Sequence, residues 1–253
     1  MSTVTVVIPA LNEQRRIGST LDTVLDVAAS QPRLRLEILV VDDGSTDNTA
    51  DVVTGYTSRH STVRLIRHQV NRGLGQALRT ALAEATGDKL LLVPGDNDMP
   101  AETIAALPAH ADRADMVMCY FPARAQRGPA RRLLSALFGL AYAICFDFVV
   151  EYINGPCVYP LARLRELQLV STRFSIVAEI NVKLLRQGVS FIEIPGRRQV
   201  GLEGSKSLSW RNLAETLRVF CQVWWQVHVS ERTRFGLRPR RVQAVSPIVA
   251  GHG

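Results

Sequence analysis

The first hundred residues alternate between two patterns of apolar positions. Four short apolar runs have the length of buried strands: residues 4–8, 36–41, 63–66 and 89–93. Between these runs, apolar residues recur at helical spacing, as at Ile17, Leu21 and Val24. We expect the third of these helices to end at Gly87 as its C-cap. Strands that alternate with helices need right-handed crossovers, so the pattern predicts an α/β fold with a mostly parallel sheet flanked by helices.

The second half of the chain is less regular. Strands are expected over residues 115–121 and 191–195, and a short strand or bend over 157–159. Residues 133–146 carry no charge, but they are too short to cross a bilayer, which needs about 20 residues. They form either a core helix or an interfacial helix with a basic flank. A long amphipathic helix is predicted over 208–229, followed by a basic, loosely ordered tail over 230–253.

Composition and charge narrow the possible partners. The net charge of +7 and pI near 9.7 favour anionic partners, namely nucleotides, phospholipid headgroups or nucleic acid. Nucleic acid is disfavoured because no basic stretch is interleaved with aromatic residues. The four cysteines form no C-x-x-C pair, which indicates reduced thiols rather than a zinc site or a disulfide framework. With no secretion signal visible at the start, we expect a cytoplasmic protein.

Two carboxylates follow the fourth apolar run. Asp96 and Asp98 flank Asn97 just after Pro94-Gly95 ends the strand. Both acids can reach one ion only if the turn curls around Asn97, since alternate positions of an extended segment point to opposite sides. Two hard oxygen ligands then suit Mg²⁺ or Mn²⁺, with substrate phosphates completing the shell. The alternative is a solvated Asx turn without a metal.

Other unusual loops follow the preceding strands. They are residues 9–13, 42–47 and 71–75, and in a parallel sheet they open on the same edge as residues 95–98. Asp43 could accept hydrogen bonds from a nucleotide base or ribose. Gly73 and Gly75 would let backbone N–H groups approach a phosphate at a helix start. Each loop alone also reads as a plain turn or helix cap, but their succession along the chain favours a shared ligand site.

At this point the chain resembles a known family. The segments PALNE, DDGSTDNT, NRGLGQAL and PGDNDMPAE, within residues 3–103, are similar to those of family 2 glycosyltransferases of the GT-A fold. The similarity extends to the branch that transfers sugars to polyprenyl phosphates. Many members of that branch read D-x-D-L-Q, whereas here Met99-Pro100 follows Asp98.

The resemblance implies an inverting hexosyltransferase that uses a UDP-, GDP- or dTDP-linked sugar. Residues 1–113 would bind the nucleotide sugar and residues 114–229 would shape the acceptor site within one GT-A domain. The donor-binding residues implied are Pro9, Ala10, Asn12, Glu13, Asp43, Ser45, Asn71, Gly73, Asp96 and Asn97. Asp96 and Asp98 would hold the metal. The acceptor would be a polyprenyl phosphate met peripherally at the cytosolic membrane face, or a small soluble molecule; a nucleotidyltransferase is the rival from another class.

Three further residues are candidates on the acceptor side, with Asp98 as the fourth catalytic candidate. Glu179 begins an amphipathic helix, where it either helps to bind the acceptor or favours the helix N-terminus. Arg198 and Lys206 resemble the basic residues of a family segment near this place, although the spacing here is longer by two residues. They offer a guanidinium fork and a point charge for phosphate, or they are solvated loop cations.

Overall fold

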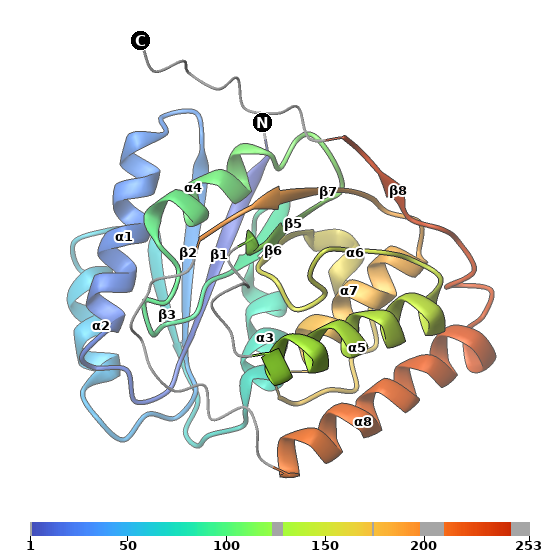
Figure 1. The fold of residues 1–253 in the computed structure, drawn as a ribbon. Helices are drawn as coiled ribbons and strands as arrows, with labels where there is room; N and C mark the ends of the chain where they lie inside the picture. Colours follow the sequence, from blue (N-terminus) through green and yellow to red (C-terminus); the bar gives the residue numbers. More distant parts are fainter. Residues whose placement is uncertain (1, 123–128, 174, 198–209, 244–253) are drawn as a thin grey trace.

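A mixed sheet forms the centre of the computed structural model, which describes residues 2–122, 129–173, 175–197 and 210–243 (Figure 1). Its strands are β1 (Thr3–Ala10), β2 (Arg35–Asp42), β3 (Val63–Arg67), β4 (Lys89–Leu92), β5 (Met116–Tyr120), β6 (Cys157–Pro160), β7 (Ser190–Pro195) and β8 (Arg240–Arg241). Their order is β3-β2-β1-β4-β6-β5-β7-β8. Only β6 runs antiparallel to its neighbours among these strands. The predicted mostly parallel sheet is confirmed.

Helices cover both faces of this sheet. They are α1 (Ile17–Ser30), α2 (Thr49–Thr57), α3 (Leu74–Glu84), α4 (Ala101–Ala109), α5 (Pro129–Phe146), α6 (Leu161–Arg165), α7 (Ile176–Arg186) and α8 (Trp210–Trp225), with a π-helical turn η2 (Gln226–Ser230) after α8. Successive residues of β1 point to opposite faces. Val6 and Ile8 therefore join the core under α1, α2 and α4, whereas Val7 joins the core under α3 and α5 to α8.

Gly87 has a different role from the predicted one. Helix α3 ends at Glu84, and its C-cap is Ala85 rather than Gly87. A Cβ at Gly87 would lie 2.8 Å from both the carbonyl oxygen of Thr3 and Oγ1 of Thr5. This glycine is therefore required by the close approach of β1, a packing constraint that local helix-capping rules do not contain.

The predicted loosely ordered tail is wrong for residues 231–243, and residues 244–253 lie outside the described part of the chain. Phe235 is 1% exposed, and its carbonyl oxygen accepts a hydrogen bond from Nε of Arg186 at 3.0 Å. Beyond it, the two residues of β8 pair with β7. One buried ring and a two-residue strand produce no periodic pattern, so neither can be predicted from the sequence.

Helix α5 packs against the core on one side, as the first of its two predicted alternatives requires, while the interfacial alternative stays a prediction. Tyr142 and Phe146 are buried against the core, while Leu137, Leu140 and Ile144 are 54%, 55% and 73% exposed. One side therefore packs and the other presents large apolar side chains to the surroundings. Within the described residues, no helix combines the length and apolarity that a bilayer crossing requires.

Candidate active site

The carboxyl ends of four parallel strands meet at one edge of the sheet. Ala10 is paired with Asp42, and Asp42 with Arg67, so β1, β2 and β3 end level with one another. The strand β4 lies on the other side of β1, and the N–H of Val93 just beyond it donates to the carbonyl oxygen of Val7 at 2.9 Å. The predicted convergence of the four loops is confirmed.

The loops after β1 and β2 are tied together by hydrogen bonds. Asn12 adopts a left-handed conformation, with φ of 56°, and its N–H donates to Oγ of Ser45 at 2.9 Å. In return, Oδ1 of Asn12 accepts from the N–H of Thr46 at 2.9 Å. At the strand end, the carbonyl oxygen of Ala10, next to Pro9, accepts from the N–H of Asp43 at 2.9 Å. These contacts place the predicted donor-binding residues of both loops side by side.

Asp43 lies at the centre of the loop cluster and is 5% exposed. Its Oδ1 accepts from the N–H of Arg72 at 3.0 Å, and its Oδ2 from the N–H of Gly73 at 2.7 Å. Oδ1 also lies 2.7 Å from Nδ1 of His68. Asn71 supports the same loop, because its Oδ1 accepts from the N–H of Gly73 at 3.0 Å. The carboxylate therefore fixes the loop over residues 71–75 to the end of β2.

His68 is a site residue that the sequence reasoning missed. Its ring is 6% exposed and bridges Asp43 to Oγ1 of Thr80, 2.9 Å from Nε2. The five histidines show no metal-ligand spacing in the sequence, so His68 carries no motif that marks it as a site residue. The signal that could have found it is its position directly after β3, which corresponds to that of Asp43 directly after β2.

Gly73 and Gly75 do not offer their N–H groups to a phosphate as predicted. The N–H of Gly73 is held by Asp43 and Asn71, and that of Gly75 donates to the carbonyl oxygen of Thr172 at 3.0 Å. A Cβ at Gly75 would lie 2.6 Å from the carbonyl oxygen of Ser171. These glycines are explained by the close approach of a second backbone segment.

The turn that carries the two acids curls at Asn97, as predicted. Asn97 has φ of 57°, and the N–H of Asp98 donates to Oδ1 of Asp96 at 3.2 Å. Among the described residues, Oδ1 of Asn97 is buried without a hydrogen-bond partner. An unsatisfied amide oxygen beside two carboxylates is the kind of oxygen-rich donor set that Mg²⁺ or Mn²⁺ prefers.

Negative charge accumulates around this turn. Burial raises the pKa of Glu13, and the carboxylates of Asp96 and Asp47 raise it further against the opposing effect of Arg16. A cation between these groups would relieve the repulsion. In the described part of the chain, no three His, Cys, Asp or Glu side chains gather into a complete metal site. The oxygens of Asp96, Asn97 and Asp98 fit an ion such as Mg²⁺ or Mn²⁺, which keeps several water or substrate ligands.

Glu179 lies away from solvent on α7 and is 1% exposed. Its two oxygens accept from the N–H groups of Val170 and Ser171 at 2.7 and 2.8 Å. Oε1 also forms an ion pair with Nζ of Lys183 at 2.5 Å. Glu179 therefore has a structural role inside the protein, and its carboxylate does not lie on a surface that an acceptor can reach. The other two acceptor-side candidates, Arg198 and Lys206, lie outside the described residues.

The sequence of this chain is similar to those of proteins whose family is known. The family model described as Glycosyl transferase family 2 matches residues 5–159. The dolichyl-phosphate beta-glucosyltransferase of Drosophila melanogaster is 38% identical over 97 residues, which are 36% of this chain and 30% of the relative. That of Homo sapiens is 34% identical over 97 residues, with the same shares. The matched region therefore spans less than a third of the length of these relatives.

Solved structures share the fold over most of the chain. The mannosyl-3-phosphoglycerate synthase of Rubrobacter xylanophilus superposes with a TM-score of 0.71 at 20% identity, covering 91% of this chain and 75% of that one. The glucosyl-3-phosphoglycerate synthase of Mycobacterium tuberculosis, in complex with Mn²⁺, UDP and phosphoglyceric acid, superposes with a TM-score of 0.65 at 19% identity. This superposition covers 88% of this chain and 78% of that one. At these identities the likeness concerns the fold. With a family match over more than half of its length, the chain belongs to glycosyl transferase family 2 and has the GT-A fold.

Proposed function

We propose that the protein transfers a hexose from a nucleotide-diphosphate sugar to a polyprenyl-phosphate acceptor, with inversion and with the help of a divalent metal. The observation that carries this proposal is that, in a family 2 chain, the Asp96–Asp98 turn and the Asp43 loop follow strands β4 and β2, which flank β1 and end at the same sheet edge. In this arrangement the loops after β1, β2 and β3 would bind the nucleoside, and the turn would lie at the diphosphate.

The donor carries the leaving group of the reaction. Sugar transfer requires a nucleoside diphosphate to leave, and a divalent ion held by Asp96 and Asp98 would neutralise the charge that develops on it. Inversion is supported by the dolichyl-phosphate relatives, which are named beta-glucosyltransferases. Common nucleotide-glucose donors carry an α-linked sugar, so a β-linked product requires a single displacement with inversion.

An acceptor phosphate fits the acceptor side of the site. A phosphate is already ionised, so it needs positioning but no general base. Glu179, the acid predicted on this side, has both oxygens engaged by Val170, Ser171 and Lys183. A hydroxyl acceptor, in contrast, would need a general base, and Glu179 is not placed to act as one. The names of the dolichyl-phosphate relatives support a lipid-linked phosphate in particular.

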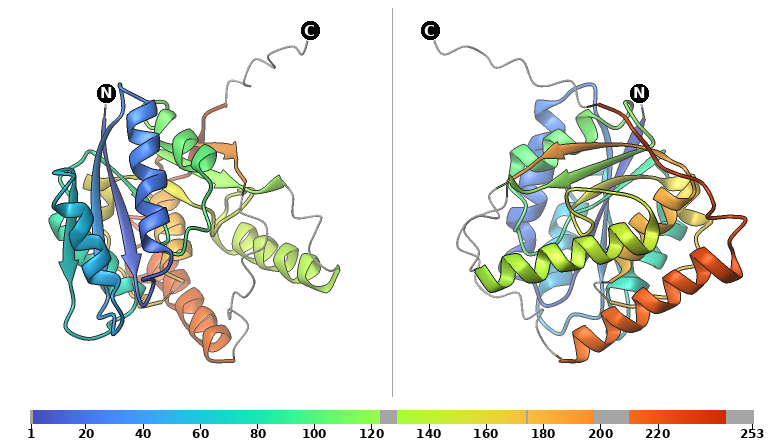
Figure 2. Two further views of the ribbon diagram at one scale, coloured as in Figure 1. Left: turned by 90° about the vertical axis from the view of Figure 1, so that its left-hand side faces the viewer. Right: turned by 45° about the vertical axis from the view of Figure 1, so that its right-hand side comes forward.

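An exposed apolar surface, here called the α5/α8 face, supports action at a membrane. It comprises Leu137, Leu140 and Ile144 of α5 with Leu217, Trp224 and Trp225 of α8, which are 40% to 73% exposed. The two helices pack together through Tyr142 and Phe220, whose ring centroids lie 5.0 Å apart. In both views of Figure 2, α8 lies lowest and α5 lies above it, and both helices are on the side of the molecule away from the chain termini. We place this face on the cytosolic leaflet as a peripheral contact, with the tryptophans at headgroup level.

A second candidate function is transfer to a small phosphorylated acceptor in solution. It is favoured by the structural neighbours, which are named as synthases of glycosyl-3-phosphoglycerates. Both acceptors present the same chemistry, a phosphate, and differ in what the phosphate is attached to. The experiment must therefore offer both.

The test is a release assay with separate arms. The protein is incubated with UDP-, GDP- and dTDP-sugars and Mn²⁺ or Mg²⁺, alone, with polyprenyl phosphate, or with 3-phosphoglycerate, and release of nucleoside diphosphate is measured. A further arm offers a nucleoside triphosphate with a sugar phosphate, and release of pyrophosphate is measured. We expect release that depends on polyprenyl phosphate. Release only with 3-phosphoglycerate would favour the second candidate, and pyrophosphate release from a nucleoside triphosphate and a sugar phosphate would indicate a nucleotidyltransferase. No release in any arm would overturn the proposal.

The membrane contact makes a separate prediction. Replacing Ile144 and Trp225 together by serine is expected to weaken co-sedimentation with anionic lipid vesicles by roughly 100-fold, because burying each large apolar side chain contributes about 1.5–3 kcal/mol. Val70→Ser is the matched control, since Val70 is 61% exposed but lies on the loop after β3. Equal vesicle binding by the double variant and the native protein would contradict the assignment of this face.

A further inference from the structure

A short segment between α6 and α7, residues 168–172, lies directly against the donor-side loop over residues 71–75. The N–H of Gly75 donates to the carbonyl oxygen of Thr172 at 3.0 Å. A Cβ at Gly75 would lie 2.7 Å from Cα of Thr172, and one at Gly73 would lie 2.8 Å from the carbonyl oxygen of Thr172. The two backbones are thus as close as backbones can pack, so a shift of segment 168–172 must shift the loop.

Glu179 holds this segment from the side of α7. Its Oε1 and Oε2 accept from the N–H groups of Val170 and Ser171. Lys183 completes the arrangement, because its Nζ contacts both Oε1 of Glu179 and the carbonyl oxygen of Gln168 at 2.5 Å. Both side chains are about 1% exposed, so these charge-assisted hydrogen bonds form away from water, where they are strong.

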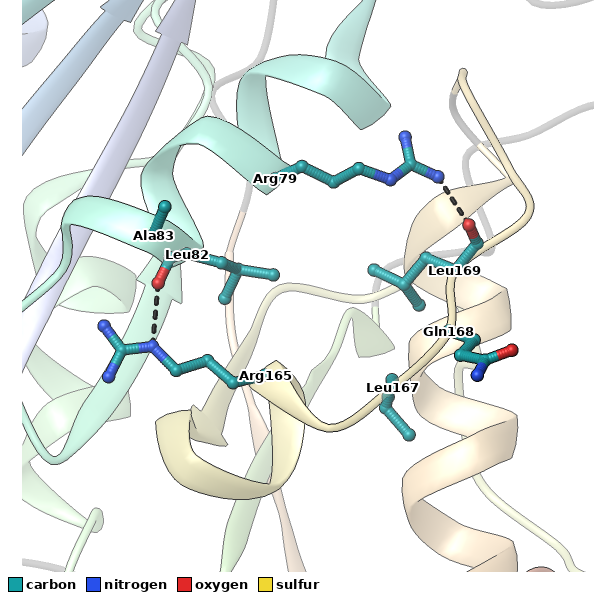
Figure 3. Close-up of a pocket in the computed structure, with 7 residues that line it drawn as sticks. All are labelled: Arg79, Leu82, Ala83, Arg165, Leu167, Gln168 and Leu169. Atoms are coloured by element: carbon teal, nitrogen blue, oxygen red, sulfur yellow. Dashed lines mark hydrogen bonds between the residues drawn. The ribbon is translucent and has the colours of Figure 1, made fainter.

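Arg79 holds the segment on its other side, where Leu167 and Leu169 also pack against the core. Arg79 of α3 donates to the carbonyl oxygens of Leu169 and Ser171, at 2.5 and 3.1 Å. Beside it lies an open cavity of about 460 Å³, bordered by Leu82, Leu167 and Leu169 (Figure 3). The cavity leaves one side of residues 167–169 without packing, so the hydrogen bonds that Arg79, Glu179 and Lys183 make add to the core contacts of Leu167 and Leu169 in holding this segment.

We propose that Glu179 is a positioning residue for the nucleotide-sugar site. It acts through segment 168–172 on the loop over residues 71–75, whose N–H groups at Arg72 and Gly73 are held by Asp43. The inference rests on the proposed function, because it takes this loop cluster as the nucleotide pocket. Glu179 would then affect binding of the donor rather than of the acceptor, and it would do so by positioning a loop rather than by taking part in the reaction.

The test perturbs the segment from opposite sides. Glu179→Gln keeps the shape of the side chain but turns an NH₂ group toward one of the two backbone donors, and Gly75→Ala pushes a methyl group into Ser171 and Thr172. Each variant is expected to weaken binding of the nucleoside diphosphate used by the native protein by about tenfold in calorimetry. The double variant is expected to lose well under 100-fold, because both changes displace the same segment.

Controls separate positioning from general destabilisation. Glu37 is a matched acid, since it also bonds a backbone N–H and a basic side chain, but it lies on β2 near the opposite sheet edge, where Glu37→Gln should leave nucleotide affinity unchanged. Gly55→Ala on α2 is the matched glycine control, because nothing lies within 4 Å of its added Cβ. In turnover, Glu179→Gln should raise the donor KM about tenfold and leave the acceptor KM within twofold of native.

The outcomes that overturn the inference are distinct from those that overturn the function. Unchanged affinity in folded Glu179→Gln, or a double variant whose loss equals the product of the single losses, would refute positioning. Should Glu179→Gln fail to fold, Glu215→Gln on α8 serves, because Glu215 accepts from the hydroxyls of Ser171 and Ser175 at 3.2 and 2.6 Å. It should weaken binding about threefold, and no change would refute positioning. A native protein that binds none of the three nucleoside diphosphates would overturn the proposed function itself.

Discussion

Asp98→Ala is expected to reduce glycosyl transfer by roughly 1,000-fold while leaving the protein folded. The turn places Asp98 beside Asp96, with Asn97 in the left-handed region between them. Removing one of two charged metal ligands weakens the stabilisation of the leaving diphosphate, and losses of this kind cost about 10²- to 10³-fold or more. The rate is measured as release of nucleoside diphosphate, and folding by circular dichroism.

A second readout ties the loss to the metal. Native protein should bind nucleoside diphosphate more tightly when Mn²⁺ is present, and Asp98→Ala should remove that increment without abolishing metal-free binding. Glu102→Gln is the matched control, since Glu102 is an exposed acid only four residues further along the chain, in the first turn of α4. Activity of Asp98→Ala within tenfold of native, or an unchanged Mn²⁺ increment, would show that the turn holds no metal.

The part of the site that follows from strand ends could be predicted from the sequence. The alternation of strands and helices predicts a parallel sheet, in which the loops that follow the strands lie at one edge. Asp43 and the acids around Asn97 could therefore be predicted to lie near each other. The left-handed turn at Asn97 also agrees with the prediction that the chain curls there, which is the condition for both acids to face one ion.

Contacts between segments distant in the chain could not be predicted. Gly73 and Gly75 carry a pattern that suits phosphate binding, but their partner is Thr172, which lies almost a hundred residues further along the chain. The position of Glu179 fits the preference for an acid near a helix N-terminus. Its oxygens, however, accept hydrogen bonds from the segment just before the helix. Local patterns name the residue type that a position needs; which neighbour imposes that need is decided by tertiary packing.

Asp43→Asn is expected to weaken nucleotide binding by about 100-fold and to lower the free energy of unfolding by about 2–3 kcal/mol. The carboxylate accepts from the N–H groups of Arg72 and Gly73 and contacts the ring of His68. An asparagine can accept through one oxygen only, so its NH₂ group would face a backbone donor in a buried site. An unsatisfied buried donor costs about 1–3 kcal/mol, and the loop must move to relieve it.

This loss should differ in kind from that of Asp98→Ala. Because Asp43 shapes the loop rather than holding the metal, Asp43→Asn should weaken binding of a nucleoside monophosphate in the absence of metal, a measurement that Asp98→Ala should leave unchanged. His68→Ala removes one partner of the carboxylate but leaves both backbone donors satisfied, so we expect a smaller loss, about tenfold.

The matched control is Asp51→Asn, an exposed acid in the first turn of α2. It loses the same charge without a buried partner, and both its affinity and its denaturant midpoint should match the native protein. If Asp43→Asn retains native affinity for the monophosphate but is destabilised, Asp43 supports the fold and the nucleoside lies elsewhere on the sheet edge. If it loses affinity without loss of stability, the carboxylate contacts the nucleotide directly through a lone pair that the loop leaves available.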